Sequence, residues 1–186
     1  EAHLAGKQTT QERFQALQEA LDMLETPSRM ECFDISHSAG EATVASCVVF
    51  DENGPRKSDY RKFNIDGITG GDDYAAMQQA LLRRYTRMKK EDARLPDVVL
   101  IDGGKGQLSS AMKSIKKLGL EGKMTVIGIA KKLEEIYFPG DSIPLYINKK
   151  SESLKLIQQA RNEAHRFAIT FHRDKRSQAF LKTELT

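Results

Sequence analysis

Residues 98–104 read Val-Val-Leu-Ile-Asp-Gly-Gly, an apolar run that ends in one aspartate and two glycines. The run predicts a short buried strand, and the glycine pair predicts the turn that ends it. A second run, Cys-Phe-Asp-Ile-Ser-His at residues 32–37, also carries a lone aspartate. A carboxylate at the end of a buried strand is costly to desolvate, and neither run holds Lys or Arg. The pair therefore suggests a shared cation and a metal-dependent hydrolase acting on phosphodiesters.

The composition describes an ordinary globular chain. Its 186 residues, 39% hydrophobic and 30% charged, suffice for one domain with a full core. No apolar stretch approaches the ~20 residues that span a bilayer, and no secretory signal is visible. Because the sequence does not begin with Met, we expect a piece of a longer protein. Cys32 and Cys47 form no Cys-x-x-Cys pair, so we expect two buried, reduced thiols and no zinc site.

Working outward from residues 98–104, the pattern predicts strands and helices along the whole chain. The expected strands cover 31–36, 43–50, 57–65, 97–102 and 124–130, with a hairpin over 136–147. The expected helices cover 9–26, 73–90, 107–118 and 152–171. Thr9 and Glu12 suggest a capping box for the first helix, Pro27 suggests its end, and residues 1–8 suggest a flexible lead-in.

This order of elements predicts the fold class. Three antiparallel strands followed by βα units are typical of an α/β, ribonuclease H-like fold, whereas a Rossmann unit alternates from the start. We expect a mixed five-stranded sheet flanked by helices, with an extra β-hairpin. In this topology the first and fourth strands are parallel neighbours, so their carboxyl ends bring Asp34 and Asp102 together.

Asp34 and Asp102 are the candidate metal ligands. Two carboxylates with open coordination positions suit Mg²⁺ or Mn²⁺; the plainer alternative is that each caps a loop or a following helix. The Gly-Gly-Lys-Gly stretch at residues 103–106 lets a backbone approach a phosphate, with Lys105 in contact, or is only a tight turn. It lacks the spacing of a Walker A loop. Asp73 lies at the expected start of a helix, where the negative charge of an acidic side chain interacts favourably with the helix dipole.

The final helix carries basic and imidazole groups on one face. Arg161, His165 and His172 are separated by four and seven residues. If this helix crosses the carboxyl edge of the sheet, His165 is a metal ligand, a general base or a leaving-group acid; otherwise it is structural. The basic tail suits a polyanionic partner, or it is simply a solvated surface. If the partner is DNA, the residues that we expect to contact its phosphate backbone are Lys105 of the glycine loop, Arg161, Arg173, Lys175 and Arg176.

Four strings together resemble the C-terminal endonuclease domain of UvrC, of bacterial nucleotide excision repair. They are Glu31–His37, Gly71–Met77, Pro96–Gln107, and Arg161–Ile169 with His172 and Arg173. The resemblance covers about residues 30–177. It implies a ribonuclease H-like endonuclease with an Asp34–Asp102–His165 triad, a further acidic position at Asp73, and dependence on Mg²⁺ or Mn²⁺.

The resemblance also implies a biological setting. The domain would nick the damaged strand on the 5′ side of a lesion in double-stranded DNA, with UvrB as partner, in the bacterial cytoplasm, and as a monomer without membrane contact. Residues 1–30 would be a linker helix, 31–177 the endonuclease domain and 178–186 a C-terminal linker.

Two other classes of function remain open from the residues alone. A non-catalytic nucleic-acid-binding module would need only the basic helix and the glycine loop. An NTPase-like domain would rest on residues 103–106 and is disfavoured by the missing Walker spacing.

Overall fold

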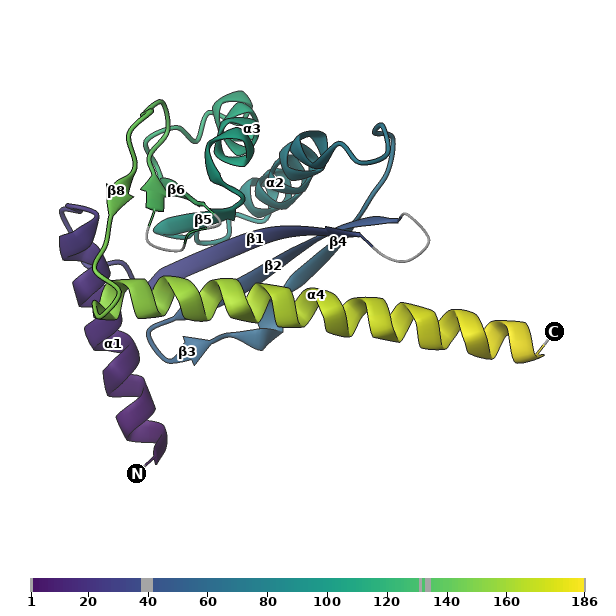
Figure 1. Ribbon diagram of the computed structural model, residues 1–186, viewed down its shortest axis with the longest axis horizontal. Helices are drawn as coiled ribbons and strands as arrows, with labels where there is room; N and C mark the ends of the chain where they lie inside the picture. Colours follow the sequence, from purple (N-terminus) through teal and green to yellow (C-terminus); the bar gives the residue numbers. More distant parts are fainter. Residues whose placement is uncertain (1, 38–41, 131, 133–134, 186) are drawn as a thin grey trace.

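The computed structural model describes the backbone of residues 2–37, 42–130, 132 and 135–185, and the side chains of residue 6 and of residues 9–170 within those ranges. It is a three-layer arrangement, with one sheet between two layers of helices (Figure 1). The strands are β1 (Arg29–His37), β2 (Thr43–Asp51), β3 (Gly54–Pro55), β4 (Arg61–Ile65), β5 (Val98–Asp102), β6 (Thr125–Ile129), β7 (Glu135–Tyr137) and β8 (Leu145–Tyr146). The helices are α1 (Ala2–Ala20), the short 3₁₀ helix η1 (Lys57–Asp59), α2 (Asp73–Lys90), α3 (Gly104–Lys117) and α4 (Glu152–Leu185).

The five expected strands form the body of the sheet, as the ribonuclease H-like order predicts. Among the described residues the sheet has eight strands in the order β3-β2-β1-β5-β6-β7-β8, with β4 also paired to β2. Strands β1, β2 and β4 are antiparallel neighbours, whereas β1–β5 and β5–β6 are parallel. The predicted hairpin is present as β7 and β8, and it extends the sheet because β7 pairs with β6.

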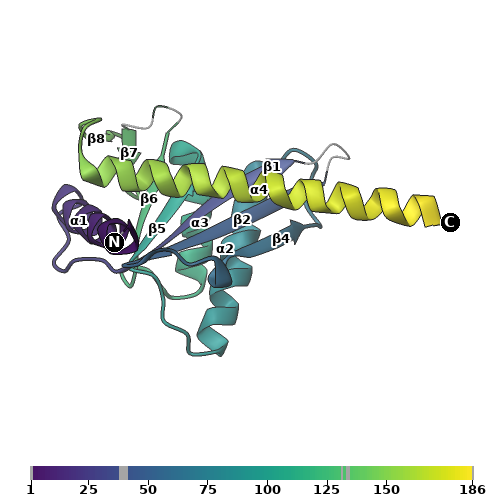
Figure 2. The same cartoon turned by 90° about the horizontal axis from the view of Figure 1, so that it is seen from below.

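Helices cover the two faces of the sheet unequally. α2 and α3 pack on one face, and α4 packs on the other against β1, β2 and α1 (Figures 1 and 2). The strands β2 and β5 are nearly continuous runs of buried residues, as expected for strands covered on both faces, and β1 is buried over Met30–Phe33. Cys32 and Cys47 are buried free thiols, as the sequence predicts.

The first helix differs from its prediction over 9–26. It begins at Ala2 and ends at Ala20, so the lead-in is helical and the capping box is wrong. The Thr10 hydroxyl donates to the Gly6 carbonyl within the helix, and Asp22 takes a left-handed conformation that ends it well before Pro27. Propensity alone placed the start at the first capping residue, but the residues upstream of Thr9, from Ala2 on, continue the same helix.

Three other boundaries also differ. The strand expected over 57–65 begins only at Arg61, because η1 precedes it and Asp59 is held there by Arg29 and Arg56. α3 starts at Gly104, directly after the glycine turn, and not near residue 107. α4 continues to Leu185, beyond the expected end near residue 171. None of the described helices is long and apolar enough to cross a membrane.

Candidate active site

The register of two parallel strands positions the two aspartates. Phe33 of β1 lies opposite Ile101 of β5, so Asp34 and Asp102, the next residue in each strand, lie side by side at the carboxyl edge. The buried apolar residues before them fix this register, because a slip by one residue would turn every side chain to the other face. Each carboxylate is 13% exposed.

Helix α4 brings His165 to the same place. Three alanines at four-residue spacing, Ala160, Ala164 and Ala168, are buried and form the face that packs on the sheet. Small side chains let the helix lie close to the strands, and His165 follows Ala164 directly. Its Nε2 lies 2.6 Å from Asp102 Oδ2 and 3.7 Å from Asp34 Oδ2. The structure therefore brings three of the predicted site residues together, from three separate elements.

The electrostatics of this cluster suit a cation. Burial raises the pKa of Asp34 to about 7, the neighbouring Asp102 acts in the same direction, and His165 opposes both. One ligand atom from each of Asp34, Asp102 and His165 lies within 4.8 Å of the others. Two carboxylates and an imidazole at this separation are a donor set for a divalent ion, so the residues fit the metal that the sequence predicts.

Arg161 and Cys32 complete the immediate surroundings. Arg161 lies one turn before His165 on α4, and its Nε is 3.5 Å from Asp102 Oδ1. That nitrogen is buried without a hydrogen-bond partner, so the ion pair leaves its N–H available. Cys32 is buried behind the carboxylates, and burial raises the pKa of its thiol, with Asp102 and Asp34 adding to the effect.

The cluster opens into a groove of about 520 Å³ between α4 and the start of α2. Asp72 and Asp73 lie on its wall: Asp72 caps α2 by accepting from the Ala75 N–H, and Asp73 Oδ1 lies 2.7 Å from His37 Nε2. Asp73 therefore lines the groove while paired with a histidine, outside the three-residue cluster. His37 ends β1 and makes this contact.

The remaining predicted residues lie elsewhere. Lys105, on the first turn of α3, has its Nζ 5.2 Å from the centroid of the Tyr137 ring. Arg173, Lys175, Arg176 and His172 lie on α4 beyond the part whose side chains the structure describes. The backbone there is helical and lies beyond the expected end of the helix near residue 171.

Sequence reasoning missed Gln107 and Tyr74, which also line the groove. Gln107 is buried on α3 and its Nε2 donates to the Asp73 carbonyl, while its Oε1 has no hydrogen-bond partner. The available signal was a long polar side chain on the buried face of α3, where the other polar residues are the small Ser110 and Ser114. Tyr74 packs against Gly106, and a Cβ at residue 106 would collide with the Tyr74 ring. Glycine at this position leaves room for the ring, a role that can be recognised only from the contact in the structure.

The fold and the cluster define a class, namely a ribonuclease H-like domain with two carboxylates and a histidine at the carboxyl edge of its sheet. The family described as "UvrC RNAse H endonuclease domain" matches residues 18–169. The chain belongs to this family.

Curated relatives agree with the family. The chain is 56% identical over 169 residues to the UvrABC system protein C of Christiangramia forsetii, covering 91% of the chain and 28% of that protein. It is 53% identical over 184 residues to the protein of that name from Pseudomonas aeruginosa, covering 96% of the chain and 30% of that protein. The chain thus spans less than a third of the length of these relatives.

Solved structures with some likeness include an Endonuclease V from Bacillus subtilis and human ENDOV. The first has a TM-score of 0.47 at 16% identity, covering 80% of the chain and 83% of that structure. The second has a TM-score of 0.45 at 16% identity, covering 76% of the chain and 84% of that structure.

Proposed function

We propose that this chain is a divalent-metal-dependent DNA endonuclease that makes the 5′ incision on the damaged strand in nucleotide excision repair. The observation that carries the proposal is the Asp34–Asp102–His165 cluster at one edge of the sheet. Membership of the UvrC endonuclease family and the shared name of the relatives support the setting. The leading alternative is a non-catalytic nucleic-acid-binding module on the same fold.

Asp34 and Asp102 would hold Mg²⁺ or Mn²⁺, with His165 beside them. Such an ion, when bound, neutralises charge on a phosphate and lowers the pKa of a bound water. The groove that opens from the cluster gives a phosphodiester access to both carboxylates.

The chain's own residues would do the remaining work. The His165 ring, held beside Asp102 by the contact of its Nε2, can accept or deliver a proton. The Arg161 guanidinium lines the groove and is positioned by Asp102, so it can donate to a non-bridging phosphate oxygen there. Asp73 would orient His37 at the far wall of the groove.

The proposal extends to the chain's organisation and partners. Residues 31–177 would be the nuclease unit, residues 1–30 a linker helix and residues 178–186 a C-terminal linker. Lesion-bearing duplex DNA and UvrB would be the partners of a monomeric domain working in the bacterial cytoplasm. Lys105, Arg173, Lys175 and Arg176 would contact the DNA backbone together with Arg161.

Strand-resolved incision of a lesion-bearing duplex tests the proposal. The assay uses the full-length protein with its partner proteins and compares wild type, Asp102→Asn and Asp141→Asn, a control on the exposed β7–β8 turn. We expect Asp102→Asn to reduce the 5′ nick by at least about 100-fold, more than the loss typical for a residue that only supports a metal ligand. The 3′ nick and the control should be unchanged.

The other outcomes are equally informative. Survival of both nicks in Asp102→Asn, with the protein still bound to DNA, would favour the binding module. If both nicks vanish, the thermal unfolding of the variant in EDTA separates misfolding from a shared role, because without metal only misfolding lowers its unfolding temperature relative to wild type.

A further inference from the structure

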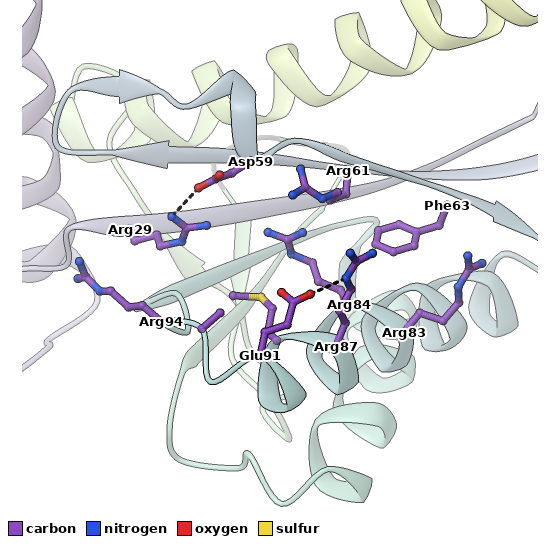
Figure 3. Close-up of a pocket in the computed structure, with 11 residues that line it drawn as sticks. Arg29, Asp59, Arg61, Phe63, Arg83, Arg84, Arg87, Glu91 and Arg94 are labelled. Atoms are coloured by element: carbon purple, nitrogen blue, oxygen red, sulfur yellow. Dashed lines mark hydrogen bonds and ion pairs between the residues drawn. The ribbon is translucent and has the colours of Figure 1, made fainter.

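A second pocket, of about 330 Å³, lies between the edge strand β4 and the C-terminal half of α2, away from the Asp34–Asp102–His165 cluster. Figure 3 shows arginine side chains converging on it from several elements. Six arginines line it with two carboxylates, Phe63 and a few small or apolar residues; the arginines are Arg29, Arg61, Arg83, Arg84, Arg87 and Arg94. We call this the arginine pocket. The proposed active site uses none of these residues.

The floor of the arginine pocket is fixed and electrically balanced. Buried Arg84 donates to both carboxylate oxygens of Glu31, at 2.6 and 3.0 Å, and Tyr85 donates to the same group at 2.8 Å. Arg29 is shared between Glu31 and Asp59, at 3.4 and 3.0 Å. These charge-assisted hydrogen bonds hold the floor rigid, and they leave little free charge there.

The rim differs from the floor. Arg87 pairs with Glu91 and Arg94 with Asp97, but Arg61 and Arg83 have no carboxylate partner among the described residues. Arg61 donates to the carbonyls of Ser58 and Tyr60. Arg83 donates to the Asn64 carbonyl and to the Gln79 side chain. Both side chains belong to exposed residues, so the surplus positive charge of the pocket sits at its open side.

Phe63 lies between these two rim arginines. It projects from β4 on the same side as Arg61, two residues earlier, and the Arg83 guanidinium lies 5.3 Å from its ring centroid. Two unneutralised guanidiniums flanking an aromatic ring combine the groups that bind phosphates with a surface on which a base can stack.

We infer that the arginine pocket binds an unpaired nucleotide segment of single-stranded nucleic acid, with Arg61 and Arg83 on its phosphates and Phe63 beside a base. The volume is at the lower end of the range for small-ligand pockets. A paired base cannot leave its stack to enter such a pocket without an unstacking cost, whereas an unpaired one enters freely.

The position of the pocket agrees with this occupant, an argument that rests on the proposed nuclease function. α2 runs from Asp73, on the wall of the active-site groove, to Arg83 at the pocket. Ten helical residues span about 15 Å. At the rise of about 3.4 Å per nucleotide along the axis of a stacked strand, this length corresponds to about four or five nucleotides. One strand can therefore lie in the groove and reach the arginine pocket.

An acidic protein segment is the competing occupant. Guanidiniums also bind carboxylates in a bidentate manner, so the charge of the arginines does not by itself separate the two occupants. The Phe63 ring beside the Arg83 guanidinium favours nucleic acid, because a base stacks on an aromatic ring and a carboxylate does not.

Fluorescence anisotropy of a labelled oligothymidylate of about 12 nucleotides, within single-strand site sizes, tests the inference. The 186-residue chain is kept in EDTA so that no strand is cut. We expect Arg61→Gln/Arg83→Gln to bind at least about 10-fold more weakly, with a salt slope smaller by about 1.4 for two lost phosphate contacts. Phe63→Leu should weaken binding without changing the slope, because it removes stacking and no charge.

The matched control is Lys116→Gln/Lys117→Gln, which removes two exposed charges at the end of α3. It should change affinity by less than the arginine variant. Equal losses in the two variants, or stronger competition by an oligoglutamate peptide than by unlabelled oligothymidylate, would overturn the inference. If the double variant does not fold, Arg61→Gln alone serves, because Arg61 donates only to backbone carbonyls.

The outcome is separable from that of the proposed function. If Asp102→Asn removes the 5′ nick and the arginine variant binds the oligonucleotide as wild type does, the nuclease proposal stands and the pocket inference fails. If the arginine variant loses binding while Asp102→Asn still cuts, the pocket inference stands and the nuclease proposal fails.

Discussion

At the scale of the residue, the turn after Asp102 depends on glycine for backbone reasons. Gly103 has φ of 133°, a region that L side chains rarely adopt, and a Cβ there would lie 2.5 Å from Gln107 Cγ. Its N–H donates to the Ile129 carbonyl, at 3.0 Å, which ties the turn to β6. Gly103 therefore fixes the point where β5 ends, at Asp102, and α3 begins.

We expect Gly103→Ala to lower the free energy of unfolding by about 1–3 kcal/mol, the cost of holding a non-glycine residue in such a conformation. The control is Gly70→Ala, where a Cβ would meet nothing within 4 Å and φ is not positive. That variant should leave stability unchanged or raise it by up to about 1 kcal/mol. Urea unfolding measures both, and equal effects in the two variants would contradict the reasoning.

At the scale of the element, side-chain contacts near His165 hold α4 against the segment that joins η1 to β4. Tyr60, which follows η1, donates its hydroxyl to Glu163 at 2.6 Å, and its ring meets the Phe167 ring edge-on at 5.0 Å. Arg166 donates to the same Glu163 carboxylate, at 2.5 and 3.1 Å. These contacts flank His165 on both sides, so they help set the position of its ring.

The Glu163 contact predicts a pH dependence of stability. Burial raises the pKa of Glu163, but hydrogen bonds from Arg166 and Tyr60 outweigh burial and hold it below its ordinary value. A carboxyl with a lowered pKa contributes stability above its ordinary pKa, and this contribution is lost as the pH falls through the folded-state value. We expect the free energy of unfolding of wild type to be about 1–2 kcal/mol higher than that of Glu163→Gln near neutral pH. This difference should shrink below about pH 4.5.

Denaturant unfolding across this pH range, with Glu121→Gln as an exposed control, gives the answer. A difference between wild type and Glu163→Gln that stays constant from neutral to acid pH would show that the charge of Glu163 does not matter.

At the scale of the whole molecule, the candidate metal site joins distant parts of the chain. Asp34 comes from β1, Asp102 from β5 and His165 from α4. Global unfolding separates all three, so a bound ion would stabilise the folded state as a whole. Without an ion, the two buried carboxylates repel each other, and the raised pKa of Asp34 reflects that cost together with burial.

We expect Mn²⁺ or Mg²⁺ to raise the thermal unfolding temperature of the chain. At 100 times the dissociation constant the gain is about 2.7 kcal/mol, or roughly 5–11 °C for a chain of this size. Asp34→Asn should lose this shift, yet unfold no earlier than wild type in EDTA, because it removes one of two crowded charges. Asp141→Asn should respond to metal as wild type does. A full metal shift in Asp34→Asn would exclude Asp34 as a ligand.

The sequence by itself determined the strands and their order, because buried runs such as Val98–Ile101 and the glycines after Asp102 are local signals. That order placed Asp34 and Asp102 at one edge. Local signals failed at helix ends. α1 starts upstream of its apparent cap, and α4 continues past the end that its apolar residues predict.

Only the tertiary structure decided how side chains from separate elements meet. It brought His165 within hydrogen-bonding distance of Asp102, paired Asp73 with His37, and gathered six arginines and Phe63 around one pocket. Each of these contacts depends on how helices pack on the sheet, which no single stretch of sequence encodes. The strands follow from local burial patterns, whereas the site and the arginine pocket follow from packing between elements far apart in the chain.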